Sequence, residues 1–143
     1  MTLRNYIAFG SGFALAKGFE TSGLSNWLAQ NLHAFKEIPL GLMILFICVL
    51  VTIISEFASN VASIQLVLPI LISLQAGFTS DPATLLVPAA LAASLGFMLP
   101  IATAPNTIVF SSGYIKVKEL AFIGLIIDVI GIILITVFSL YLV

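Results

Sequence analysis

From Pro82 to Ile115 the chain contains no charged residue. One unbroken α-helix of that length would reach about 50 Å, whereas the hydrocarbon core of a membrane is about 30 Å thick. The run includes the segment Pro100–Asn106, which has a proline near each end. Proline lacks an amide donor and disrupts the helical turn before it. We therefore expect a broken helix over about residues 82–115, interrupted at mid-depth and with its two halves in line.

The composition places the whole chain in a membrane. Hydrophobic residues make up 61% of it and charged residues 8%, with a mean hydropathy of +1.24, whereas a soluble domain carries about 25% charged residues. Because so few charges cannot cover a water-facing surface, we predict a multi-pass integral membrane protein in which residues 1–143 form a single membrane region. No basic patch favours nucleic acid as a partner, and the lone Cys48 excludes an intrachain disulfide.

A second polar break, Ser55–Asn60, separates the apolar runs Ile38–Ile54 and Val61–Leu74. A helix over Val61–Gln75 would reach only about 22 Å, which is too short to cross a membrane. We therefore expect residues 39–75 to form a re-entrant helical hairpin. Its polar tip is tolerated at membrane depth only where protein or a watery cavity surrounds it.

The remaining segments are expected to form a scaffold around these two breaks. Residues 118–142 are apolar enough for a final full span, residues 3–19 form a closely packed glycine-containing helix, and residues 20–36 are amphipathic and suit the membrane interface. Lys116 and Lys118 favour the cytoplasmic side, so the hairpin would enter from outside. The predicted fold class is thus all-α: a re-entrant hairpin, a broken helix and a final transmembrane helix.

Each break ends one helix and begins another, which suits it to binding ions. A beginning helix offers free N–H groups to a carboxylate, and an ending helix offers carbonyl oxygens to a hard cation such as sodium. Ser59 and Asn60 add a hydroxyl and an amide at the first break, and Thr103 and Asn106 add the same groups at the second. Because many secondary transporters build their sites from broken helices, we interpret the two breaks as two walls of one site.

Residues 55–61, Ser-Glu-Phe-Ala-Ser-Asn-Val, and residues 98–113, Met-Leu-Pro-Ile-Ala-Thr-Ala-Pro-Asn-Thr-Ile-Val-Phe-Ser-Ser-Gly, resemble the C-terminal half of the divalent anion:sodium symporters. That family includes the sodium/dicarboxylate and sodium/citrate cotransporters, and the resemblance covers nearly the whole chain. It implies a sodium symporter built from two inverted repeats, of which this chain would supply the second. The N-terminal half and a homodimeric partner would then lie outside these residues, and the chain alone is not expected to transport.

The resemblance also implies roles for individual residues. Substrate contacts would come from Ser59, Asn60, Val61 and Thr103, and sodium contacts from Ser55, Ala58, Asn60 and Ala102, some through backbone carbonyls. Val61 stands where the family has threonine, so one hydroxyl is missing from the anion site. Ala104 stands where the family often has proline. Sodium is the only cofactor expected.

The substrate expected is a divalent anion, with a C4-dicarboxylate as the first choice and citrate, sulfate or another anion as alternatives. The number of sodium ions, and coupling to protons or to an exchanged anion instead, stay open. The other expected partner is membrane lipid, and the expected location is the plasma (inner) membrane.

Two acids in apolar segments and two other functions complete the set of alternatives. We expect Glu56 to brace the hairpin, rather than to bind sodium directly or to be a solvated turn acid, and Asn106 to support the site. We expect Asp128 to be a packing partner that faces other helices, because no second acid or base neighbours it in the sequence. A non-transporting membrane subunit is the alternative function. An enzyme is disfavoured, since no His/Glu metal pair and no serine or cysteine with a plausible base is present.

Overall fold

The structure, a computed structural model, describes residues 38–75, 81 and 83–142, together with Gly18, residues 21–23 and Trp27. Within this part of the chain all regular secondary structure is helical. The elements are α3 (Leu40–Phe57), α4 (Asn60–Gln75), α5 (Ala83–Ala92), α6 (Ala104–Ser111) and α7 (Val117–Leu142). The helix expected over residues 3–19 and the amphipathic segment over residues 20–36 lie largely outside the described residues.

α3 and α4 form a helical hairpin whose tip is shorter than the sequence suggested. Only Ala58 and Ser59 are non-helical, because Ser55 and Glu56 still belong to the last turn of α3 and Asn60 already begins α4. The expected break over Ser55–Asn60 was therefore too long. Ala58 has an extended backbone, and the Ser59 hydroxyl accepts from the Ala62 amide at 3.3 Å, which caps the first turn of α4.

The second break is longer than expected and begins earlier. α5 ends at Ala92 and α6 begins at Ala104, so residues 93–103, the unwound segment from here on, are not helical. The expected break at Pro100–Asn106 was therefore misplaced: Pro105 and Asn106 lie in the first turn of α6, where proline is tolerated because the amides there have no helical partner. α5 begins as expected, with the Asp81 carboxylate accepting from the Ala83 amide at 2.9 Å.

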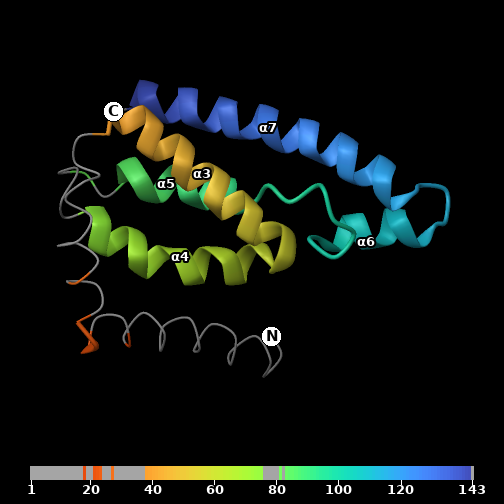
Figure 1. Cartoon of the computed structure of the whole chain (residues 1–143), viewed down its shortest axis with the longest axis horizontal. Helices are drawn as coiled ribbons and strands as arrows, with labels where there is room; N and C mark the ends of the chain where they lie inside the picture. The colour runs from red at the N-terminus through yellow and green to blue at the C-terminus, as the bar shows by residue number, and fades with distance from the viewer. Residues whose placement is uncertain are drawn as a thin grey trace.

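The helices pack in a bundle around α3 and α5 (Figure 1). α7 runs the full length of one side, α4 lies on the other, and α5 packs against α3, α4 and α7. The core joins branched side chains of α3 to small side chains of α5; its fully buried members include Ile44, Cys48, Val51, Leu85, Ala89 and Ala92. Alanines allow helix backbones to approach closely, and this closeness lets side chains of α3 reach the backbone of α5.

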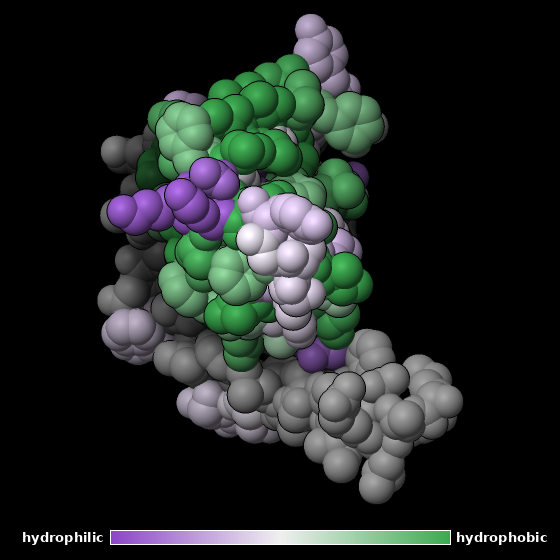
Figure 2. Space-filling view, turned by 90° about the vertical axis from the view of Figure 1, so that its right-hand side faces the viewer, coloured by the Kyte–Doolittle hydropathy of each residue, from purple (hydrophilic) through white to green (hydrophobic). Residues whose placement is uncertain are grey.

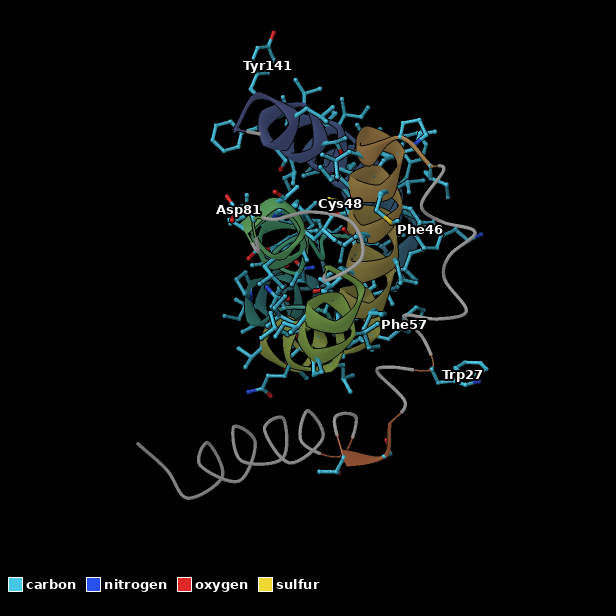
Figure 3. The ribbon with its side chains drawn as sticks, turned by 90° about the vertical axis from the view of Figure 1, so that its left-hand side faces the viewer. Trp27, Phe46, Cys48, Phe57, Asp81 and Tyr141 are labelled. Atoms are coloured by element: carbon cyan, nitrogen blue, oxygen red, sulfur yellow. The ribbon has the colours of Figure 1, made fainter. Side chains whose placement is uncertain are left out.

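Two helices, α3 and residues Val117–Tyr141 of α7, are long and apolar enough to cross a membrane. Their outward faces carry exposed hydrophobic side chains such as Phe46, Phe57 and Tyr141 (Figure 3). Figure 2 views the end of the molecule where α6 and the start of α7 lie, and its surface is mainly hydrophobic around a small hydrophilic area. The first turn of α7 and the residue before it carry the exposed charged side chains of Lys116, Lys118 and Glu119.

Candidate functional site

The hairpin tip and the unwound segment are joined by the carboxylate of Glu56. This side chain projects from the last turn of α3 and is only 4% exposed. Its two oxygens accept hydrogen bonds from the amides of Met98, at 2.9 Å, and Leu99, at 2.8 Å. Bonds from amides to a carboxylate are about twice as strong as bonds between neutral groups. Glu56 therefore makes the contact that its interpretation as a brace requires.

Side chains of α3 also donate hydrogen bonds to carbonyl groups in the second half of α5 and just after its end. The Ser55 hydroxyl lies 2.7 Å from the Ala93 carbonyl oxygen, the Thr52 hydroxyl lies 3.4 Å from that of Ala92, and the Cys48 thiol lies 3.8 Å from that of Pro88. The last carbonyls of a helix have no partner within it, and a buried carbonyl without a partner is costly. α5 ends in tight turns in which the Ala93, Ser94 and Leu95 amides donate to its last carbonyls, and the side chains of α3 add further donors there.

The unwound segment is also tied to α6. The Asn106 side-chain amide donates to the carbonyls of Gly96, at 2.9 Å, and Leu99, at 3.0 Å, while the Thr107 hydroxyl donates to that of Pro100 at 2.6 Å. The Thr103 hydroxyl accepts from the Asn106 amide at 3.4 Å and caps α6. The carbonyls of Gly96, Leu99 and Pro100 thus have hydrogen-bond partners outside a regular helix.

α7 supports the unwound segment from the other side. Asp128 is 2% exposed, and its Oδ2 lies 3.5 Å from the Phe97 amide. Asp128 has no acidic neighbour in the sequence, but the fold brings the Glu56 carboxyl close enough to interact with it. Sequence reasoning also missed that Gly124, Asp128 and Gly131 are spaced i, i+4 and i+7, which puts them on one helix face. That spacing in the sequence indicates a face of the final helix against which another segment can pack closely.

The structure gathers three of the four residues that the resemblance assigns to sodium. Asn60 Oδ1 lies 3.0 Å from the Ser55 hydroxyl. Gly96 packs against Ser55 and Ala102, since a methyl group added there would lie 3.5 Å from Ser55 Oγ and 3.6 Å from Ala102 Cβ. The fourth residue, Ala58, lies in the hairpin tip between Ser55 and Asn60. Hydroxyl, amide and carbonyl oxygens are ligands that hard cations accept.

The residues assigned to the substrate lie at the beginnings of two helices. Ser59, Asn60 and Val61 form the start of α4, where Ser59 is exposed and Val61 is 48% exposed. Thr103 caps α6 and is partly exposed. Among the hydrogen bonds of the described residues, none joins Thr103 to the hairpin tip. Its hydroxyl instead accepts a hydrogen bond from the backbone amide of Asn106.

Comparison with known proteins identifies the family. The family model of the sodium:sulfate symporter transmembrane region matches residues 4–142. Solute carrier family 13 member 2 of Rattus norvegicus is 47% identical over 130 residues, which cover 91% of this chain and 22% of the relative. Na(+)/dicarboxylate cotransporter 3 of Homo sapiens is 40% identical over 130 residues, again 91% of this chain and 22% of the relative.

A bacterial relative gives the same result. The sodium-dependent dicarboxylate transporter SdcS of Staphylococcus saprophyticus is 40% identical over 129 residues, which cover 90% of this chain and 25% of the relative. The chain thus spans a quarter or less of the length of these curated relatives. Since the family model extends over nearly all of its residues, the chain belongs to the family of the sodium:sulfate symporter transmembrane region.

Proposed function

We propose that this chain is part of a sodium-coupled symporter for a divalent anion, and that the hairpin tip and the unwound segment form half of its binding site. The carrying observation is that two interrupted helices are bonded to each other at their interruptions, through Glu56 and Ser55, in a chain of this family. Mere kinks between packed helices would not need a buried carboxylate to hold backbone amides. This favours the symporter over a non-transporting membrane subunit.

The depth of the tip supports a re-entrant hairpin. α7 is 26 residues long, about 39 Å at 1.5 Å per residue, and Asp128 lies about 17 Å from its first residue. Glu56 binds the amides next to Phe97, and Phe97 contacts Asp128. The tip is therefore level with the middle of α7. The other ends of α3 and α4 lie together at the far end of the bundle (Figure 1), as they would if the hairpin entered and left on one side.

We assign sodium to the oxygens around Ser55, Ala58, Asn60 and Ala102. Two of these, Ser55 Oγ and Asn60 Oδ1, are neighbours in a buried region, and the ends of α3 and α5 bring carbonyl oxygens to the same region. A sodium ion bound there would supply positive charge in a neighbourhood where no described residue is a lysine or arginine. That charge would attract an anion into the low-dielectric interior.

We assign the anion to Ser59, Asn60, Val61 and Thr103. The α4 and α6 helices both begin at these residues, and helix beginnings favour negative charge. The side chain of Val61 can offer only an apolar contact, so the hydroxyl of Ser59 and the side-chain amide of Asn60 would hold the carboxylate on the hairpin side.

The substrate we propose is a C4-dicarboxylate, because relatives from human and Staphylococcus saprophyticus bear dicarboxylate in their names. Citrate and sulfate are the competing anions, the latter from the family description. Transport requires sequence beyond these residues: an inverted N-terminal half that completes the site, in a homodimer embedded in the lipid of the plasma (inner) membrane.

Uptake of labelled succinate by the full-length protein that contains this segment, in proteoliposomes with and without a sodium gradient, tests the proposal. Asn60→Ala and Thr103→Ala should each abolish sodium-dependent uptake at normal protein levels. Gln65→Ala, farther along α4, and Thr136→Ala, whose hydroxyl donates to the Ile132 carbonyl of its own helix, are the matched controls and should transport normally. Uptake unaffected by Asn60→Ala and Thr103→Ala would favour the non-transporting subunit. Competition by excess citrate or sulfate ranks the anions.

A further inference from the structure

Three consecutive backbone amides of the unwound segment are held by carboxylates of two different helices. The Phe97 amide lies 3.5 Å from Asp128 Oδ2 of α7, and the Met98 and Leu99 amides donate to Glu56 of α3. Asp128 is nearly fully buried, and its Oδ1 has no hydrogen-bond partner among the described residues. A buried carboxyl in an apolar helix is costly, so a position used only for packing would be better filled by a neutral side chain.

The surroundings of Asp128 on α7 are shaped to receive backbone. A Cβ added at Gly124 would collide with the Phe97 carbonyl group and lie 2.6 Å from Met98 Cα, whereas one at Gly131 would lie 2.8 Å from a side-chain atom of Leu95. Gly124, Asp128 and Gly131 therefore form a platform, and the carboxyl of Asp128 stands between the two glycines. The backbone of the unwound segment packs directly against this platform.

Movement of the unwound backbone along the platform would change the geometry of the proposed sodium site. Gly96, next to Phe97, packs against Ser55 and Ala102, and the Asn106 side chain couples the carbonyls of Gly96 and Leu99. A shift of residues 97–99 would therefore change the separation of Ala102 from the hairpin tip. Among the described residues, no hydrogen bond joins Asp128 to the hairpin oxygens Ser55 Oγ and Asn60 Oδ1.

We propose that Asp128 is a positioning residue for the sodium site: with Glu56 it fixes the amides of residues 97–99 on the α7 platform and so sets the distance between Ala102 and the hairpin. This inference rests on the proposed function, because it names the group that tunes the same site from outside it. Asp128 acts through the unwound segment and does not touch the ion.

Hydrogen–deuterium exchange of the purified full-length protein tests the structural half of the inference without any transport. Asp128→Ala should speed exchange of peptides that cover residues 97–102. Ser139→Ala, another buried α7 side chain with an unpaired hydroxyl, should leave that exchange unchanged. Asp128→Asn keeps an oxygen that can accept from Phe97 and should restore most of the protection. Equal exchange in Asp128→Ala and the unsubstituted protein would overturn the inference.

The sodium dependence of uptake tests the functional half. Asp128→Ala should raise the sodium concentration for half-maximal uptake about fivefold, the effect expected for losing one hydrogen bond, and leave the maximal rate within about twofold. Asp128→Asn should recover most of the loss. Gly124→Ala is the second variant, because it displaces the same backbone with both carboxylates intact; the protein that still folds, isolated by size-exclusion chromatography, should need a higher sodium concentration for half-maximal uptake.

The outcomes separate the two proposals. A lower maximal rate with unchanged sodium dependence in Asp128→Ala and Gly124→Ala would indicate a purely structural role and overturn the inference. Asp128→Asn as damaging as Asp128→Ala would mean that the charge itself contacts the ion, which would also overturn it. Absence of sodium-dependent uptake in the unsubstituted protein would instead contradict the proposed function, and the exchange measurement would still decide whether Asp128 holds the segment.

Discussion

Glu56 illustrates how an acidic side chain is retained inside an apolar protein. Its carboxylate lies at the hairpin tip, and both of its oxygens accept backbone amides of the unwound segment. Hydrogen bonds to a charged group contribute about 1.5–3 kcal/mol each, and removing the acceptor leaves buried donors without partners. The stability of the site region therefore depends on a single side chain more than on any apolar contact near it.

We predict that Glu56→Ala lowers the free energy of unfolding by about 3 kcal/mol or more, because two buried amides lose a charged acceptor. Thermal unfolding of the purified protein in detergent measures the change. The matched control is Glu119→Ala, since Glu119 is exposed and accepts one amide at 3.2 Å from Lys116, and its loss should cost less than about 1 kcal/mol. Equal shifts in the two variants would contradict the bracing role.

Asn106 is the corresponding residue on the other side of the unwound segment. We predict that Asn106→Ala costs about 2 kcal/mol, because the carbonyls of Gly96 and Leu99 lose their donors. Ser111→Ala in the same helix is the control, since the Ser111 hydroxyl is exposed and bonds only to Ile108. Unfolding temperatures of the two variants, measured side by side, should differ clearly. An unchanged unfolding temperature in Asn106→Ala would argue against a stabilising role for the bonds from Asn106 to Gly96 and Leu99.

At the scale of helices, α3 and α7 hold the broken helix from opposite sides in different ways. α3 presents donors and one carboxylate, which replace the bonds that the backbone loses where α5 ends. α7 presents a smooth face of two glycines and Asp128, against which the unwound backbone lies. The break is therefore stabilised by both neighbouring helices, in addition to the bonds that Asn106 and Thr107 make within it.

The glycine face predicts a graded response to added methyl groups. Gly124→Ala should be strongly destabilising, because the methyl group would collide with backbone at Phe97 and Met98, although alanine by itself favours a helix by about 1 kcal/mol over glycine. Gly131→Ala should be milder, because it meets only the flexible end of Leu95. The two unfolding temperatures give the order, and a Gly124→Ala variant as stable as the unsubstituted protein would show that the contact is absent.

At the scale of the whole molecule, the hairpin and the broken helix are complementary. Polar groups at each interruption find their partners in the other element, through Ser55 and Glu56 on one side and Ala93, Met98 and Leu99 on the other. Neither element could be placed in an apolar environment alone without unsatisfied backbone groups. We therefore expect the two to fold and insert as one unit.

Insertions should reveal the depth of the hairpin tip. For the re-entrant hairpin that we propose, a short Gly/Ser linker between Ala58 and Ser59 should prevent accumulation of folded protein, because Glu56 beside the tip binds the unwound segment at membrane depth. The same linker between Gly113 and Tyr114, both exposed in the connection from α6 to α7, should be tolerated. Membrane fractions analysed by size-exclusion chromatography compare the two. Equal tolerance would indicate that the tip reaches a surface, as two complete spans would require.

The sequence by itself determined the helical character, the two interruptions and the boundaries of the long helices. The final helix was expected over residues 118–142 and is Val117–Leu142, and the hairpin over residues 39–75 agrees with α3 and α4 within one residue at its outer ends. These features follow from apolar length and from local signals such as Asp81 before α5, which act on neighbouring residues and are therefore legible along the chain.

Only the tertiary structure decided where the second helix is broken and which acids meet. α5 ends at Ala92, well before Pro100, at a place where Thr52 and Ser55 add donors to carbonyls at its end and Glu56 accepts amides beyond them. The approach of Asp128 to Glu56 likewise depends on a glycine at position 124 that lets backbone lie against α7. Such partners are far apart in the sequence, so the hydrogen bonds that replace a helix become visible only when the chain is folded.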